Sequence, residues 1–83
     1  MEVVTPVGVA FRGPATSLVA PGTEGYLGVL PGHTPLVLSL GRGKLAFTAS
    51  GVSRQLRIGA GYMEVTPASV IVITEEAEEE GVS

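Results

Sequence analysis

Acid–base chemistry in this chain would have to centre on His33, the only histidine among 83 residues, because an imidazole titrates near neutral pH. His33 lies between two prolines in residues 31–35 (Pro-Gly-His-Thr-Pro), which predicts a tight turn. A general base also needs an orienting carboxylate and a substrate pocket. Glu24 and Glu64 could orient it only if the fold brought them close. A turn histidine more often bonds its own loop or meets a partner, so we expect no catalytic residue and no enzymatic activity of the chain's own.

Metal and cofactor chemistry lacks the residues that it needs. The chain has no cysteine, which excludes disulfides and thiolate metal sites, and one histidine cannot build a zinc site alone. The glycines do not follow the spacing of a phosphate-binding loop, and no helix is expected after them to supply its N-terminus. We therefore expect no metal and no cofactor.

Lys44 raises one alternative function. It is the only lysine, and an all-β chain of about this size could be a carrier domain of the lipoyl or biotinyl type. Such a carrier needs a lysine exposed at a hairpin tip, with an acidic or methionine neighbour. Lys44 follows Gly-Arg-Gly, lacks such a neighbour and is expected to begin a strand. A carrier modified on Lys44 remains the alternative interpretation.

The charges are unevenly placed. Residues 1–74 hold three acidic and five basic residues, whereas residues 75–83 hold five glutamates. We expect residues 75–83 to be an acidic, flexible tail after a domain at 1–74. Four arginines and one lysine without interleaved aromatics do not predict a nucleic-acid surface. No apolar run is long enough for a membrane span and no secretory leader is visible, so a cytoplasmic chain is expected unless an import segment has been removed.

The elements that must position these residues are strands. No window before residue 75 shows helical periodicity without glycine or proline, and short Val-, Ile-, Leu- and Phe-rich segments alternate with turns. This predicts an all-β fold in one small domain, whose limited core favours a permanent partner. The expected strands lie near residues 2–5, 8–12, 15–20, 26–30, 35–40, 43–49, 52–58, 61–66 and 69–74.

Two of these strands form the clearest hairpin. In residues 44–49, Leu45, Phe47 and Ala49 alternate with polar or small residues, and in residues 52–58 Leu56 and Ile58 do the same. Ser-Gly at positions 50–51 is a two-residue connection that favours a tight turn. We expect one face of this hairpin to be exposed to solvent and the other to be buried.

Two other strands are apolar on both faces. Residues 70–73 read Val-Ile-Val-Ile, and in residues 36–40 the leucines share one face while Val37 lies on the other. A sandwich buries only its inner faces, so Val37 and an outward pair of residues 70–73 should contact something outside the chain. The alternative is that strand propensity alone selected these residues. The pattern predicts an apolar protein-binding face.

Residues 21–36 carry a family resemblance. They read Pro-Gly-Thr-Glu-Gly-Tyr-Leu-Gly-Val-Leu-Pro-Gly-His-Thr-Pro-Leu, which resembles the signature Gly-x-Glu-Gly-x-Leu-Gly-Ile-x-Pro-Gly-His-x-Pro-Leu of F-type ATP synthase ε subunits, called δ in mitochondria. Residues 59–67 resemble the family's Gly-Gly-hydrophobic-hydrophobic-Glu-Val-x-Pro, and residues 2–6 and 9–13 resemble its first two strands. Together the matches extend to about Glu78.

The resemblance implies an antiparallel two-sheet β-sandwich of about nine to ten short strands. It implies a non-catalytic rotor subunit at the foot of the central stalk, which binds the γ subunit and the polar loops of the c ring. Such a subunit couples proton flow to ATP synthesis while other subunits hold the catalytic residues. Its place would be peripheral, on the cytoplasmic face of a bacterial plasma membrane.

Carried over by position, the resemblance implies two contact sites. Glu24 matches an acidic position in the loop that faces the c ring, and this site comprises Glu24, Gly25 and Tyr26. Tyr26 stands where the family often has a second acidic residue, so the contact is expected to be less ionic. The γ-facing site comprises His33, Thr34, Val37 and Ile71. The match selects Ile71 over Val70 as the outward residue.

The chain is shorter than most of the family. Its bacterial and chloroplast members continue into two C-terminal helices, which in many cases inhibit ATP hydrolysis and in some bind ATP. Here the sequence stops at Ser83, so it represents either a truncated or a naturally short member. We expect that this chain does not bind ATP.

Overall fold

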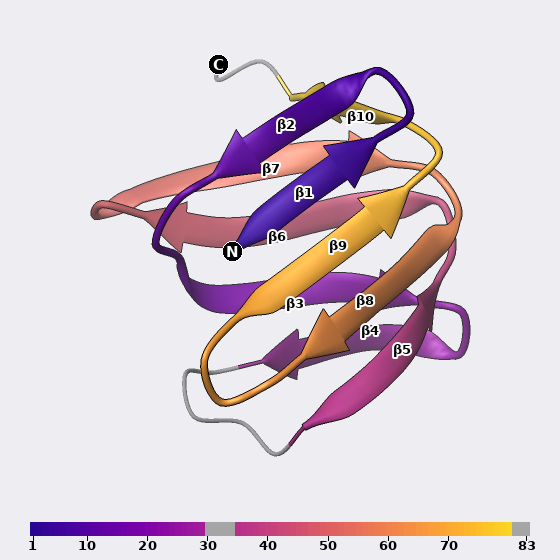
Figure 1. Cartoon of the computed structure of the whole chain (residues 1–83), viewed down its shortest axis with the longest axis horizontal. Helices are drawn as coiled ribbons and strands as arrows, with labels where there is room; N and C mark the ends of the chain where they lie inside the picture. The colour runs from indigo at the N-terminus through magenta and orange to yellow at the C-terminus, as the bar shows by residue number, and fades with distance from the viewer. Residues whose placement is uncertain (30–34, 81–83) are drawn as a thin grey trace.

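The computed structural model describes residues 1–29 and 35–80, and all regular structure within them is β (Figure 1). Ten strands follow one another along the chain. They are β1 (Glu2–Thr5), β2 (Gly8–Arg12), β3 (Thr16–Gly22), β4 (Gly25–Val29), β5 (Leu36–Leu40), β6 (Gly43–Ala49), β7 (Val52–Ile58), β8 (Gly61–Val65), β9 (Val70–Thr74) and β10 (Ala77–Glu79). Each of the nine expected strands coincides with one of the first nine, within one or two residues at the ends.

The strands form two layers packed face to face. The back layer runs β10-β7-β6-β3, with β4 paired to β3, and the front layer runs β5-β8-β9-β1-β2. Figure 1 shows β2, β1, β9 and β8 crossing in front of β7, β6, β3 and β4. The layers join at one residue pair, Gly22 of β3 with Leu40 of β5, so the sheet is nearly closed. This confirms the predicted all-β, two-layer architecture.

One pairing departs from the antiparallel expectation. β1 runs parallel to β9, with Glu2 opposite Ile71 and Val4 opposite Ile73, whereas the other described pairings are antiparallel. Parallel neighbours need a long connection between them. Here the connection comprises strands β2 to β8, which lie between β1 and β9 in the sequence.

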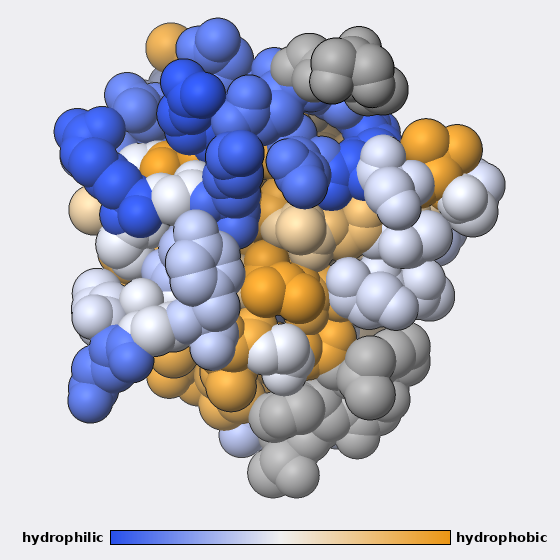
Figure 2. All heavy atoms as spheres, turned by 180° about the vertical axis from the view of Figure 1, so that it is seen from behind, coloured by the Kyte–Doolittle hydropathy of each residue, from blue (hydrophilic) through white to orange (hydrophobic). Residues whose placement is uncertain are grey.

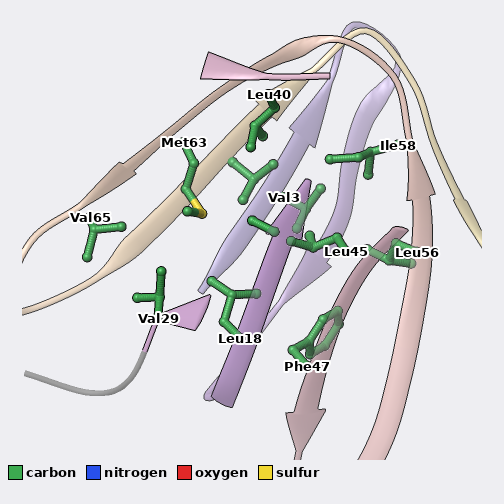
Figure 3. Close-up of a cluster of buried hydrophobic side chains, with 12 residues drawn as sticks. Val3, Leu18, Val29, Leu40, Leu45, Phe47, Leu56, Ile58, Met63 and Val65 are labelled. Carbon is green, nitrogen blue, oxygen red and sulfur yellow. The ribbon is translucent and has the colours of Figure 1, made fainter. Parts of the chain in front are cut away.

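The core lies between the layers and is entirely apolar apart from one threonine. Leu45 and Phe47 of β6 and Leu56 and Ile58 of β7 are buried, as their alternation predicts. Figure 3 shows how side chains of both layers meet in this space. The buried apolar residues are Val3, Leu18, Ala20, Val29, Leu40, Leu45, Phe47, Leu56, Ile58, Met63, Val65 and Val72.

The β6–β7 hairpin forms as predicted. Its register runs without a break from Gly43 opposite Ile58 to Ala49 opposite Val52. Ser50 and Gly51 both have positive φ, at 51° and 78°. Two such residues make the type I′ turn, whose twist matches that of the paired strands.

An aromatic contact joins β2, at the edge of the front layer, to β6 of the back layer. The rings of Phe11 in β2 and Phe47 in β6 are tilted by 58° with centroids 4.8 Å apart, and the Arg54 guanidinium lies 4.9 Å from the Phe11 ring centroid. Aromatic pairs and cation–π contacts of this geometry are favourable. They hold the free edge of the front layer onto the back layer.

The structure differs from the expected acidic tail at residues 75–83. Ala77–Glu79 forms β10, which pairs antiparallel with β7, and the Glu80 N–H donates a hydrogen bond to the Gln55 carbonyl at 2.9 Å. Ala77 also packs against the core. Up to Glu80 these residues are therefore part of the sandwich rather than a solvated end, because β7 offers them a free backbone edge and two arginines.

Candidate functional site

Ile71 and Ile73 lie on the face of the front layer that points away from the core. Val72 of β9 is fully buried and Val70 packs against the core, so the residues that alternate with them face outward. Ile73 is 40% exposed. The outward orientation of Ile71 that the family match selected is therefore confirmed.

Val37 lies on the same outer face. Its side chain is 70% exposed, whereas Leu40 is buried and Leu36 and Leu38 pack against the core. Among the described strand residues, Val37 is the most exposed large hydrophobic side chain. The predicted outward position of Val37 is confirmed.

Cross-strand pairing brings these residues into one row. Val37 is opposite Glu64, and Glu64 is opposite Ile71; Glu2 follows on the other side of Ile71. Neighbouring strands lie about 4.8 Å apart, so Val37 and Ile71 are separated by about 10 Å, with Glu64 between them. We call Val37, Glu64, Ile71 and Glu2 the first row of the outer face.

A second row, shifted by two residues along each strand, is more apolar. It consists of Ser39, Tyr62, Ile73 and Val4. Tyr62 is 48% exposed and borders a shallow hollow with Ile73 and Val4. The full lining is Val4, Thr5, Pro6, Gly61, Tyr62, Ile73, Thr74 and Glu75. Sequence reasoning missed Tyr62 and Val4, although alternation in residues 61–65 placed Tyr62 opposite in direction to the apolar Met63.

The two carboxylates of the first row differ in their surroundings. Glu2 is paired with Arg12 of β2, whose Nε lies 2.8 Å from the carboxylate. Glu64 is exposed and has no ion-pair partner among residues 1–29 and 35–80. Among the described residues of the outer face, Glu64 is thus the carboxylate that no cation neutralises.

The candidate c-ring site lies at the turn between β3 and β4. Gly22 is opposite Gly25, so Thr23 and Glu24 form the tip, and Glu24 is exposed. Tyr26 is 63% exposed, but its hydroxyl accepts a hydrogen bond from the Lys44 N–H at 3.3 Å. Tyr26 therefore lies along the hairpin toward β6, which leaves Glu24 as the charged tip.

Two predicted contact residues, His33 and Thr34, lie outside the described residues. The structure therefore does not describe whether Glu24 or Glu64 lies near His33. Of the γ-facing set, the structure thus places Val37 and Ile71.

Glutamates from the C-terminal segment neutralise the basic residues of the back layer. Arg54 forms a bidentate pair with Glu79, at 2.9 Å and 2.6 Å, and Arg57 lies 3.1 Å from Glu80. Arg42 lies within 3.3 Å of Glu75 and Glu76. Figure 2 views this layer from behind and shows hydrophilic side chains gathered in its upper part, with an apolar band below.

Lys44 does not occupy the position that a carrier domain requires. It is the second residue of β6 rather than part of a hairpin tip, and its Nζ lies 3.6 Å from Glu80. A lysine within a strand and beside a carboxylate is poorly presented to a modifying enzyme. The geometry therefore does not favour the carrier interpretation.

The Arg54–Glu79 pair should make stability depend on acid pH. Arg54 hydrogen-bonds the Glu79 carboxylate and lies beside it as a positive charge, which lowers the pKa of Glu79 below its ordinary value of 4.5. A lowered folded-state pKa stabilises the fold above the unfolded value and loses that contribution as the pH falls through the folded value. We expect Glu79→Gln to reduce the urea midpoint more at pH 7 than at pH 3. Equal losses at both pH values would contradict this, and Glu78→Gln is the control, because Glu78 is exposed and unpaired among the described residues.

The described part of the chain has no group of three or more His, Cys, Asp or Glu side chains that could hold a metal ion. It also has no helix with the length and apolar character needed to cross a membrane. A further hollow at one end of the sandwich, between Met1, Ser17 and Ser69, is lined by hydroxyl and apolar side chains without a described carboxylate.

Comparison with known sequences and structures identifies the family. The family model described as ATP synthase, Delta/Epsilon chain, beta-sandwich domain matches residues 1–80. The ATP synthase epsilon chain of Koribacter versatilis is 39% identical over 77 residues, covering 93% of this chain and 54% of that protein. The epsilon chain of Syntrophomonas wolfei is 42% identical over 79 residues, covering 94% and 58%. The chain thus spans little more than half the length of these relatives.

Solved structures agree. A chain in the Euglena gracilis mitochondrial ATP synthase OSCP/F1/c-ring structure superposes with a TM-score of 0.87 at 26% identity, over 94% of this chain and 51% of that one. A chain of the Tetrahymena thermophila mitochondrial ATP synthase central stalk and c ring gives a TM-score of 0.76 over 92% of this chain and 62% of that one. At 14% identity it supports the fold alone. With a family model over residues 1–80 and relatives near 40% identity, the chain belongs to the ATP synthase delta/epsilon chain family, whose β-sandwich domain it forms.

Proposed function

We propose that this chain is a non-catalytic central-stalk subunit of a rotary, proton-translocating ATP synthase. In this role it binds the γ subunit and the c ring and turns with the rotor, so that ion flow is coupled to ATP synthesis. Family membership and the likeness to epsilon chains support the proposal. Within that complex the chain is peripheral, on the cytoplasmic face of a bacterial plasma membrane.

The observation that carries the proposal is the outer face of the front layer. Val37 and Ile71 come from strands far apart in the sequence and lie in one row, with Tyr62, Ile73 and Val4 beside them. Contiguous exposed apolar groups on a small domain mark protein contacts. We assign this face to the γ subunit, together with His33 and Thr34.

The β3–β4 turn is the proposed c-ring contact. Glu24 lies at its tip, and Gly25 and the exposed Tyr26 follow at the start of β4. The strands of this hairpin are packed into a sheet, and they hold its charged tip in place. A tip held in this way can make polar contacts with the loops of the c ring. The Tyr26 hydrogen bond to the start of β6 supports this rigidity.

Mixing the purified chain with the γ subunit from the same organism tests the proposal. We expect a one-to-one complex that survives size-exclusion chromatography, because the outer face offers an apolar contact. Failure to form a complex when both proteins are folded would overturn the assignment. A subunit of an unrelated ATPase that has no central stalk serves as the negative control for binding.

Nucleotide binding is expected to be absent. The resemblance implies that ATP binding, in the members that have it, belongs to the C-terminal helices, and the described residues contain no helix and no glycine-rich phosphate loop that opens one. Isothermal titration calorimetry with ATP and Mg²⁺ should show only heats of dilution. Saturable heat at millimolar nucleotide or below would contradict this prediction.

A further inference from the structure

Glu64 occupies an unusual position on the outer face. Its cross-strand neighbours on both sides, Val37 and Ile71, are apolar. All five lysine and arginine residues of the chain pair with other glutamates: Arg12 with Glu2, and Arg42, Lys44, Arg54 and Arg57 with residues 75–80. None of these five cations is therefore left to neutralise Glu64.

Docking on the first row must cover Glu64. A partner that contacts Val37 and Ile71 also spans the carboxylate between them, because the three residues lie on adjacent strands. Burying a carboxylate without a counter-charge and hydrogen bonds is strongly unfavourable. Glu2 does not have this difficulty, since Arg12 already contacts it. The partner must therefore supply the missing positive charge.

We infer that the partner surface carries a lysine or arginine opposite Glu64, beside an apolar side chain that fills the hollow between Tyr62, Ile73 and Val4. This rests on the proposed function and names the chemistry of the partner at that site. Tyr62 is two residues from Glu64 along β8, so the basic and apolar groups should lie about 7 Å apart. The ion pair fixes how the partner is aligned on the outer face and makes binding selective, and the apolar side chain adds contact area.

The test compares binding of variants to the γ subunit at about 50 mM and about 500 mM salt, which changes the screening of an ion pair. We expect Glu64→Gln to weaken binding about tenfold or more at low salt and to flatten the salt dependence. Glu78→Gln, which removes an exposed carboxylate on β10 in the other layer, should bind as the wild type does. Circular dichroism confirms that each variant is folded.

A second variant separates the hollow from the charge. Ile73→Ala removes apolar contact and should weaken binding by similar factors at both salt concentrations. Wild-type binding and salt dependence for Glu64→Gln would overturn the ion pair, and unchanged binding for Ile73→Ala would overturn the anchor. In either case a complex between γ and the wild type leaves the proposed function intact. No complex with the wild type would overturn both the function and the inference.

Discussion

Ile71→Glu is expected to weaken the complex with the γ subunit by about 100-fold, because it buries a charge in an apolar contact. Cross-strand pairing sharpens the effect. Ile71 has Glu64 on one side and Glu2 on the other, so the new carboxylate would lie between two others, and like charges directly opposite each other are unfavourable. Arg12 already pairs with Glu2, so a γ surface that supplies one cation for Glu64 leaves the new carboxylate without a counter-charge.

Val37→Glu should weaken the same complex by a smaller factor, since only Glu64 lies beside it. Val52→Glu is the matched control, because Val52 is 59% exposed at the β6–β7 hairpin in the other layer. Titration of γ by surface plasmon resonance gives the three affinities. If Ile71→Glu and Val37→Glu co-purified with γ at wild-type levels, the outer face would not be the contact surface.

Gly61→Ala is expected to lower the free energy of unfolding by about 3 kcal/mol, which is a large effect for a domain of this size. Gly61 is opposite Thr74 in the β8–β9 pair. A Cβ there would overlap the Ile73 carbonyl oxygen and lie 2.8 Å from the Thr74 Cα. Both are backbone atoms, so the clash can be relieved only by separating the two strands.

Urea unfolding measures this difference, with Gly28→Ala as the control. A Cβ at Gly28 of β4 would meet nothing within 4 Å, so that variant should stay within about 0.5 kcal/mol of the wild type. Equal stabilities for Gly61→Ala and Gly28→Ala would show that β8 and β9 can separate without cost. Since Gly61 also borders the hollow, Gly61→Ala should weaken γ binding as well.

Local alternation was enough to predict the strands and the direction of most side chains. Leu45, Phe47, Leu56 and Ile58 are buried as predicted, because a period of two along a strand depends only on neighbouring residues. The outward position of Val37 followed from the same rule. That of Ile71 needed the family match, because residues 70–73 are apolar on both faces.

Features that depend on pairing between distant segments could not be predicted. The position of Glu64 between Val37 and Ile71 is set by strand order, which alternation does not contain. The same limit explains β10. The glutamate run looks like a solvated end until Arg54, 25 residues earlier in the chain, is placed beside Glu79.

The parallel pairing of β1 with β9 also constrains when the domain can form during synthesis. β1 lies between β2 and β9 in its layer, so β1 gains its second neighbour only after β9 has been synthesised. A chain with mostly long-range pairings folds slowly, and its early segments cannot be stable alone. The proposed γ-binding face, which draws on β1, β5, β8 and β9, therefore cannot form before β9 is synthesised. If γ binds there, we expect assembly to follow the synthesis of β9.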